Sequence, residues 1–130
     1  MQPNILVVDD DLGILHAIRI TLEDEGYHVV AAENGQIALE IVADTPPNLI
    51  LLDMMMPKMD GSAFARELER RNLKDSIPIV LLTAGGRARQ LADAIGATTY
   101  LQKPFDIDDL LGVVESLAGP SAAPHMSGNL

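Results

Sequence analysis

Five short apolar runs, each bounded by turn-forming or polar residues, constrain the fold of this 130-residue chain more than any other feature. The first, third and fourth runs are rich in Val, Ile and Leu and show no polar alternation. Such continuous apolarity is typical of strands that are covered on both faces, as in a parallel sheet. The runs predict five strands, at residues 5–8, 29–32, 49–52, 79–82 and 99–101.

The segments between the runs carry apolar residues at every third or fourth position, which is the period of an amphipathic helix. Breaker residues mark where helices should end: Gly26 after the first, the proline pair at Pro46 after the second and Gly96 after the fourth. Asp106 or Asp108 is expected to cap the start of the fifth helix.

Strict alternation of strands and helices predicts a single doubly wound α/β domain, a (βα)5 unit of the flavodoxin-like class, because parallel neighbours need a crossover helix. The expected sheet order is 2-1-3-4-5, with helices on both faces, and ligands of such folds bind beyond the carboxyl ends of the two central strands. We expect the domain to span residues 1–118. Residues 119–130 have linker composition and are expected to form a flexible tail or the start of a linker.

The charge balance excludes several classes of function. With 9 Lys and Arg against 19 Asp and Glu, the net charge is −10, which disfavours direct binding to nucleic acid or to anionic membranes. The chain has no cysteine, so it has no disulfide, no thiolate nucleophile and no Cys-based metal site. The opening residues lack a cationic region and the apolar runs are too short for a signal peptide or a membrane span, so we expect a cytoplasmic protein.

Polar residues terminate the apolar runs in a way that indicates a site. Three acids starting at Asp9 follow the first run, Asp53 follows the third, Thr83 follows the fourth, and Lys103 comes shortly after the fifth. In the predicted topology these residues converge on one edge of the sheet. Carboxylates about 5 Å apart repel by roughly 3 kcal/mol per pair at an effective dielectric near 20. A hard divalent cation would remove this repulsion, and oxygen ligands without His or Cys favour Mg²⁺.

A cation beside Asp53 would let this carboxylate attack phosphorus and form an acyl phosphate, with Lys103 neutralising the remaining charge and the Thr83 hydroxyl binding a phosphoryl oxygen. Each residue taken alone also has an ordinary interpretation. The acids at Asp9–Asp11 could cap the first helix, and the Met54–Met56 run is interpreted as packing. The joint placement of the polar residues favours a site.

These fragments resemble the receiver domain of two-component response regulators, of the chemotaxis type, over residues 4 to 117. The residues that carry the resemblance are Val8-Asp9-Asp10, Asp53 with Pro57 and Asp60-Gly61, Leu82-Thr83-Ala84, and the run from Tyr100 through Lys103-Pro104 to Phe105.

The resemblance implies a role for each acidic residue. Asp53 matches the phosphoacceptor and a metal ligand, Asp10 the direct Mg²⁺ ligand, and Asp9 the acid that binds the metal mainly through water. The backbone carbonyl of Met55 matches a further ligand. The domain would therefore receive a phosphoryl group from a phosphohistidine of a sensor histidine kinase or phosphotransfer protein in a Mg²⁺-dependent reaction.

The resemblance also implies a switch. Lys103 matches the phosphate-binding lysine, with a cis peptide bond before Pro104, and Thr83, Ala84 and Tyr100 match the residues that respond to the phosphoryl group. The response would remodel the surface of the fourth helix, fifth strand and fifth helix, where a downstream effector docks or a weak homodimer forms. On this interpretation the chain is a signalling domain that catalyses only its own phosphoryl transfer and dephosphorylation.

The chain departs from the family pattern in the separation of Thr83 and Lys103, which at 20 residues is a couple shorter than in many members, and in a glycine pair. Gly85 and Gly86 stand where the fourth helix should begin, so this helix should be short or mobile. Met55 and Gly85 occupy the two family positions that set the lifetime of the phosphoryl group, and neither can orient an attacking water. We therefore expect slow self-dephosphorylation.

Three alternatives remain open from the sequence. The main one is a haloacid-dehalogenase-type, Mg²⁺-dependent phosphatase with Asp9 as nucleophile and Asp11 as the second acid, although the chain is short for that class and Asp53 would have no role. A flavodoxin-like FMN carrier is disfavoured by the acidic first loop. A receiver-like scaffold without phosphorylation is disfavoured by the intact acidic set and Lys103.

Overall fold

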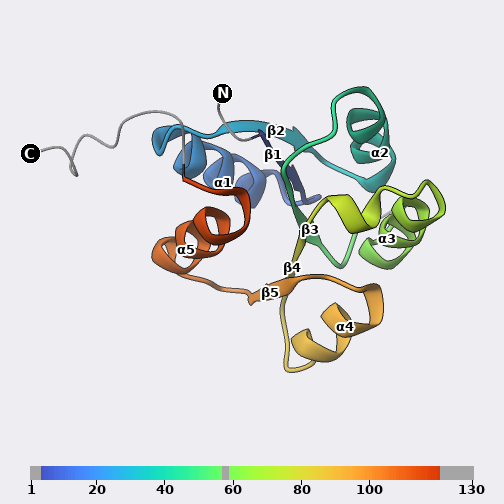
Figure 1. The fold of residues 1–130 in the computed structure, drawn as a ribbon. Coiled ribbons are helices and arrows are strands. Elements are labelled where there is room, and N and C mark those ends of the chain that lie inside the picture. The colour runs from blue at the N-terminus through green and yellow to red at the C-terminus, as the bar shows by residue number, and fades with distance from the viewer. Residues whose placement is uncertain (1–3, 57–58, 121–130) are drawn as a thin grey trace, which may run out of the picture.

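The computed structural model describes residues 4–56 and 59–120. Pro57, which belongs to one of the motifs above, and residues 121–130 of the expected tail lie outside the described residues. Figure 1 shows the described chain as one layer of strands between two layers of helices.

Strands and helices alternate as predicted, and every strand lies within one residue of its predicted bounds. The elements in chain order are β1 (Asn4–Val8), α1 (Leu12–Asp24), β2 (His28–Ala32), α2 (Gly35–Asp44), β3 (Leu49–Asp53), α3 (Gly61–Arg70), the 3-10 helix η1 (Lys74–Ser76), β4 (Ile79–Thr83), α4 (Ala88–Ile95), β5 (Thr99–Gln102) and α5 (Ile107–Ala118).

The five strands form one parallel sheet of order β2-β1-β3-β4-β5, which confirms the predicted topology. Successive side chains of each strand point to opposite faces. Leu6 and Val8 of β1 pack with residues of α2, α3 and α4, whereas Ile5 and Val7 pack with residues of α1 and α5. Figure 1 shows these two groups of helices on opposite faces of the sheet. Because helices cover both faces, every residue of β3 and β4 is buried, and this explains the absence of polar alternation in those runs.

The ends of the last two helices follow the predicted signals with one difference in length. Gly96 ends α4 with a φ of 72°, a left-handed conformation that glycine adopts without strain. Asp106 is the N-cap residue of α5, although its side chain makes no capping hydrogen bond. Helix α4 has only 8 residues because residues 84–87 lie outside it, which confirms the expectation of a short fourth helix.

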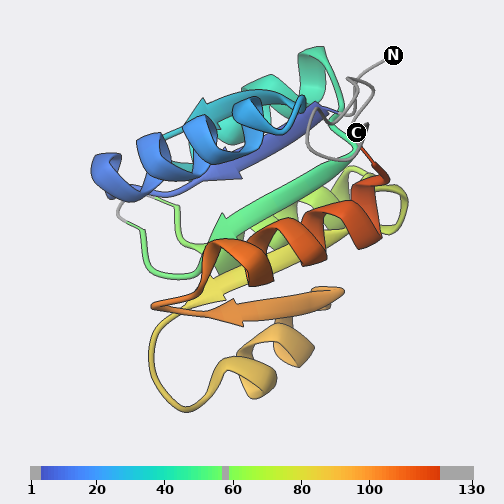
Figure 2. The same ribbon diagram turned by 90° about the vertical axis from the view of Figure 1, so that its left-hand side faces the viewer.

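The end of α5 is fastened to the sheet by a tyrosine. Tyr27, just before β2, donates a hydrogen bond from its hydroxyl to the carbonyl of Gly119 at 2.8 Å. Gly119 is the C-cap residue of α5. Helix α5 therefore ends at the amino-terminal edge of the sheet, where β1 and β2 begin (Figure 2).

Candidate functional site

The register of the sheet brings two acidic residues together at the carboxyl ends of the central strands. Val8 of β1 pairs with Leu52 of β3, so Asp9 and Asp53 follow at neighbouring positions. Carboxylate oxygens of Asp9, Asp10 and Asp53 all lie within 4.8 Å of one another. We call these three residues the acid cluster. They lie at the edge of the sheet where the topology predicted a site.

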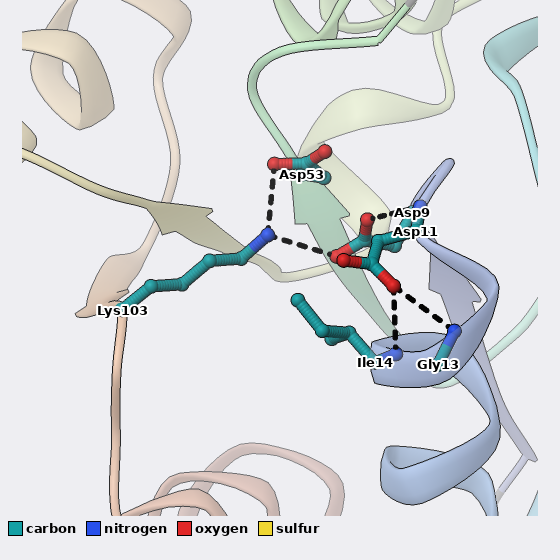
Figure 3. A network of polar contacts seen from close by, with 6 residues as sticks. All are labelled: Asp9, Asp11, Gly13, Ile14, Asp53 and Lys103. Atoms are coloured by element: carbon teal, nitrogen blue, oxygen red, sulfur yellow. Dashed lines mark hydrogen bonds and ion pairs between the residues drawn. The ribbon is translucent and has the colours of Figure 1, made fainter.

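Lys103, which follows β5, supplies positive charge to this site. Its Nζ donates to Asp9 Oδ2 at 3.0 Å and to Asp53 Oδ1 at 3.3 Å, as Figure 3 shows. The Lys103 amide also donates to the carbonyl of Thr83 at 2.8 Å, which extends the β4–β5 pairing beyond the strands. The Lys103–Pro104 peptide bond is cis, in agreement with the expectation from the resemblance.

Burial and like charge make the ionised form of Asp53 costly. Asp9 is fully buried and Asp53 is 5% exposed. Burial, and then the charge of Asp9, raise the pKa of Asp53 to about 6, against the opposing effect of Lys103. Burial alone would lower the pKa of Lys103, but its interactions with Asp9 and Asp53 outweigh that effect and raise it. The site therefore holds more negative charge than the single lysine compensates.

Asp11, the third acid of the run, has a different role. Its Oδ1 accepts hydrogen bonds from the amides of Gly13 at 3.0 Å and Ile14 at 3.2 Å, so it is the N-cap of α1. The Asp11 amide in turn donates to Asp9 Oδ1 at 2.9 Å, which fixes the orientation of the Asp9 carboxylate (Figure 3). The capping interpretation of the acidic run is thus correct for Asp11.

The acid cluster fits a hard divalent cation. It offers only oxygen ligands, it gathers three carboxylates around one point, and the raised pKa of Asp53 reports charge that a cation would compensate. Asp9 and Asp53 are buried but Asp10 is exposed, so a cation could reach the acid cluster from solvent on the Asp10 side. These features favour Mg²⁺, which commonly binds through a few carboxylates and keeps its remaining positions for water or phosphate oxygens.

The expected switch residues lie on the neighbouring strands β4 and β5, with Thr83 at the same edge of the sheet as Asp53. Thr83 is 3% exposed, and its hydroxyl donates to the carbonyl of the exposed Ala84 at 3.3 Å. Tyr100 is half-buried and packs against the core beneath α2, α3 and α4. The guanidinium of Arg89 in α4 lies over the Tyr100 ring, 5.4 Å from its centroid.

The methionine run corrects one prediction. Met54 and Met56 are buried, as packing residues should be, but the Met55 side chain is 77% exposed. Met55 is the second residue past the end of β3, where the chain has left the sheet. The packing interpretation is therefore wrong for the Met55 side chain, which is exposed two residues after Asp53.

An apolar groove that the sequence did not predict lies beside Lys103. The groove has a volume of about 500 Å³ and lies between α1 and α5, with Lys103 and Ala84 in its wall. We call it the α1–α5 groove. A sign of it in the sequence is a second pair of apolar residues on α1, Ile14 and Ala17, beside the core line of Leu15, Ile18 and Leu22.

The comparison with known proteins identifies the family. Residues 5–115 match the response regulator receiver domain family. The chain is 37% identical over 131 residues to the DNA-binding dual master transcriptional regulator RpaA of Synechocystis sp., covering 95% of this chain and 54% of RpaA. It is 38% identical over 133 residues to the phosphate regulon transcriptional regulatory protein PhoB of Pseudomonas aeruginosa, covering 97% of this chain and 58% of PhoB. The chain therefore belongs to the receiver domain family of two-component response regulators.

Solved structures agree with this assignment. The chemotaxis protein CheY4 of Vibrio cholerae matches with a TM-score of 0.83 and 31% identity, covering 90% of this chain and 99% of CheY4. The chain spans little more than half the length of RpaA and PhoB. None of these similarities supports a haloacid-dehalogenase-type phosphatase. Among the described residues, no helix combines the length and the apolar character that crossing a membrane requires.

Proposed function

We propose that this receiver domain accepts a phosphoryl group on Asp53 from a phosphohistidine of a sensor histidine kinase or phosphotransfer protein. The observation that carries the proposal is the contact of one lysine, Lys103, with two buried carboxylates at the switch point of the sheet. In the reaction an Asp53 oxygen bonds to phosphorus, the phosphorus–nitrogen bond breaks, and the donor imidazole leaves with the electron pair.

The residues of the chain have separate tasks in this proposal. Asp9, Asp10 and the Met55 carbonyl would hold Mg²⁺, which when bound supplies neutralisation of negative charge around the phosphoryl oxygens. The Lys103 ammonium is already within hydrogen-bond distance of Asp53 and would bind a phosphoryl oxygen. Thr83 and Ala84 would bind the phosphoryl group on the β4 side, and Tyr100 would change its position in response.

The phosphoryl group should be long-lived. Hydrolysis needs a water molecule held in line with the phosphorus. Gly85 has no side chain, and the thioether of Met55 is a poor hydrogen-bond partner for water. We therefore expect slow loss of phosphate without a partner protein.

The α1–α5 groove is the proposed contact surface for the phosphodonor. A protein that brings phosphohistidine to Asp53 must contact the residues around the site. The exposed apolar side chain of Ile107 forms part of the groove wall, and Lys103 lies in the same wall. An amphipathic helix of the donor would bury this surface.

The remaining expectations are part of the same proposal. The domain would act in the cytoplasm as a signalling domain without a separate enzymatic substrate, and would not bind nucleic acid or membranes directly. It would transmit its state to a downstream effector through the α4–β5–α5 surface, where a weak homodimer could also form.

Intact-mass measurement after incubation with acetyl phosphate or phosphoramidate and Mg²⁺ tests the proposal. We expect one phosphate adduct on the wild type and none on Asp53→Ala. Omitting Mg²⁺ should abolish the adduct as well. An adduct that persists in Asp53→Ala and disappears in Asp9→Ala would instead support the phosphatase alternative.

A further inference from the structure

The loop between β4 and α4, residues 84–87, has few contacts of its own. All four residues are exposed. Gly85 has a φ of 94°, and a Cβ atom built at Gly85 or Gly86 would meet nothing within 4 Å. The N-cap residue of α4, Arg87, makes no side-chain capping hydrogen bond. Local packing therefore does little to fix the conformation of this loop.

Two side-chain contacts connect this region to β5. Gln102 pairs with Thr83 in the β4–β5 ladder, and its Nε2 donates to the carbonyl of Gly85 at 2.7 Å. Arg89, in the first turn of α4, places its guanidinium over the ring of Tyr100. Both contacts join the loop or the start of α4 to the edge strand of the sheet.

We propose that Gln102 and Arg89 form a clamp that holds the β4–α4 loop in the arrangement of the unphosphorylated domain, so that phosphorylation of Asp53 has to open it. The inference rests on the proposed function and adds two positioning residues to it. Neither residue touches the acid cluster; each acts through the loop or through Tyr100.

The contacts of Thr83 connect the clamp to the site. The Thr83 hydroxyl donates to the carbonyl of Ala84, the residue directly before Gly85. When this hydroxyl turns toward a phosphoryl group on Asp53, the Ala84 carbonyl loses its donor and the loop is free to move. A displaced Gly85 carbonyl no longer meets Gln102, and a Tyr100 ring that changes position no longer meets Arg89. The clamp therefore stabilises only one of the two states.

Removal of the clamp should shift the equilibrium toward the state that binds phosphate. We expect Gln102→Ala and Arg89→Ala each to raise the rate of adduct formation with phosphoramidate and Mg²⁺ about two- to tenfold. Arg89→Lys keeps a cation over the ring and should restore most of the wild-type rate. Gln36→Ala on α2 and Arg66→Ala on α3 replace exposed residues of the same types away from the loop and serve as matched controls.

Amide hydrogen exchange of residues 84–90 gives the second measurement. We expect faster exchange in unphosphorylated Gln102→Ala than in the wild type, and a similar increase in the wild type after phosphorylation. Equal adduct rates and equal exchange in wild type and Gln102→Ala would overturn the clamp while the proposed function stands. A wild type that forms no adduct would instead overturn the proposed function, and with it the opening step.

Discussion

The acid cluster with Lys103 and the β4–α4 loop lie at the same edge of the sheet, yet they are held in place differently. Asp9 and Asp53 follow buried strands whose register fixes their positions, and Lys103 contacts both carboxylates. The loop is exposed and contains two glycines, Gly85 and Gly86. It is connected to β5 by the hydrogen bond of Gln102 and by the contact of Arg89 with Tyr100. On the proposed function the difference separates two tasks: a rigid frame would hold the reacting groups, while the part that responds would be attached by contacts that can be lost and remade.

The largest expected effect tests the rigid region. Lys103→Met leaves the buried carboxylates of Asp9 and Asp53 without a cation, so the free energy of unfolding should fall by about 3 kcal/mol in the absence of divalent ions. Urea unfolding measures the loss, and added Mg²⁺ should recover part of it. Arg19→Met is the control because it removes only an exposed ion pair with Glu23, worth about 0.5 kcal/mol or less. Equal losses in the two variants would mean that Lys103 does not stabilise the cluster.

The next effect concerns the groove, whose wall includes residues of both regions. Ile107→Glu places a charge on an apolar surface that a protein donor would bury, and we expect phosphotransfer from a phosphohistidine protein to slow at least tenfold. Ile107 is 59% exposed, so the fold should tolerate the change. Transfer from acetyl phosphate should stay at the wild-type rate. Ile20→Glu, on the part of α1 outside the groove, is the matched control.

Magnesium should stabilise the wild type and not a variant without the phosphoacceptor charge. Each tenfold rise in Mg²⁺ concentration above the dissociation constant should add about 1.4 kcal/mol to the free energy of unfolding. Asp53→Asn should respond much less to Mg²⁺. Without metal this variant should be more stable than the wild type by about 1 kcal/mol, because burial and Asp9 disfavour the Asp53 charge and solvent screens part of that effect. A full Mg²⁺ response in Asp53→Asn would place the metal elsewhere.

The smallest effect tests the lifetime of the phosphoryl group. Met55→Asn introduces an amide that can orient water, so phosphorylated protein should lose phosphate several-fold faster, equivalent to about 1 kcal/mol in the barrier. Decay followed by intact mass measures the rate. Met55→Leu should leave it unchanged. An identical decay rate in Met55→Asn and the wild type would contradict the role assigned to this position.

The sequence predicts the rigid region better than the responsive one. The apolar runs determine the strands and their order, and the order alone places Asp9 beside Asp53 at one edge of the sheet. The sequence predicted that Lys103 would lie beside the acidic residues. It could not predict which carboxylates Lys103 contacts or at what distance, because these depend on the path of the chain after β5. The exposure of Met55 was not predictable from an apolar run, because burial after the end of a strand depends on which helix lies above it.

The contacts of Gln102 and Arg89 left no signal in the sequence. Both are exposed polar residues outside the apolar periods, and the Tyr100–Phe105 run that contains Gln102 assigns no role to its side chain. Their partners, a glycine carbonyl and one face of a half-buried ring, are determined only once α4 lies beside β5. Such contacts follow from tertiary packing, which sequence patterns do not describe.

The hydrogen bond from Tyr27 to Gly119 has a consequence for how a signal can leave the domain. It anchors the last helix at the amino-terminal edge of the sheet, whereas Asp53 ends β3 at the opposite, carboxyl edge. Any polypeptide that continues from that point starts about one sheet length away from the phosphoryl group and out of its direct reach. A conformational change caused by phosphorylation would therefore have to reach such a segment through the surface of the domain, and not through direct contact with the phosphoryl group.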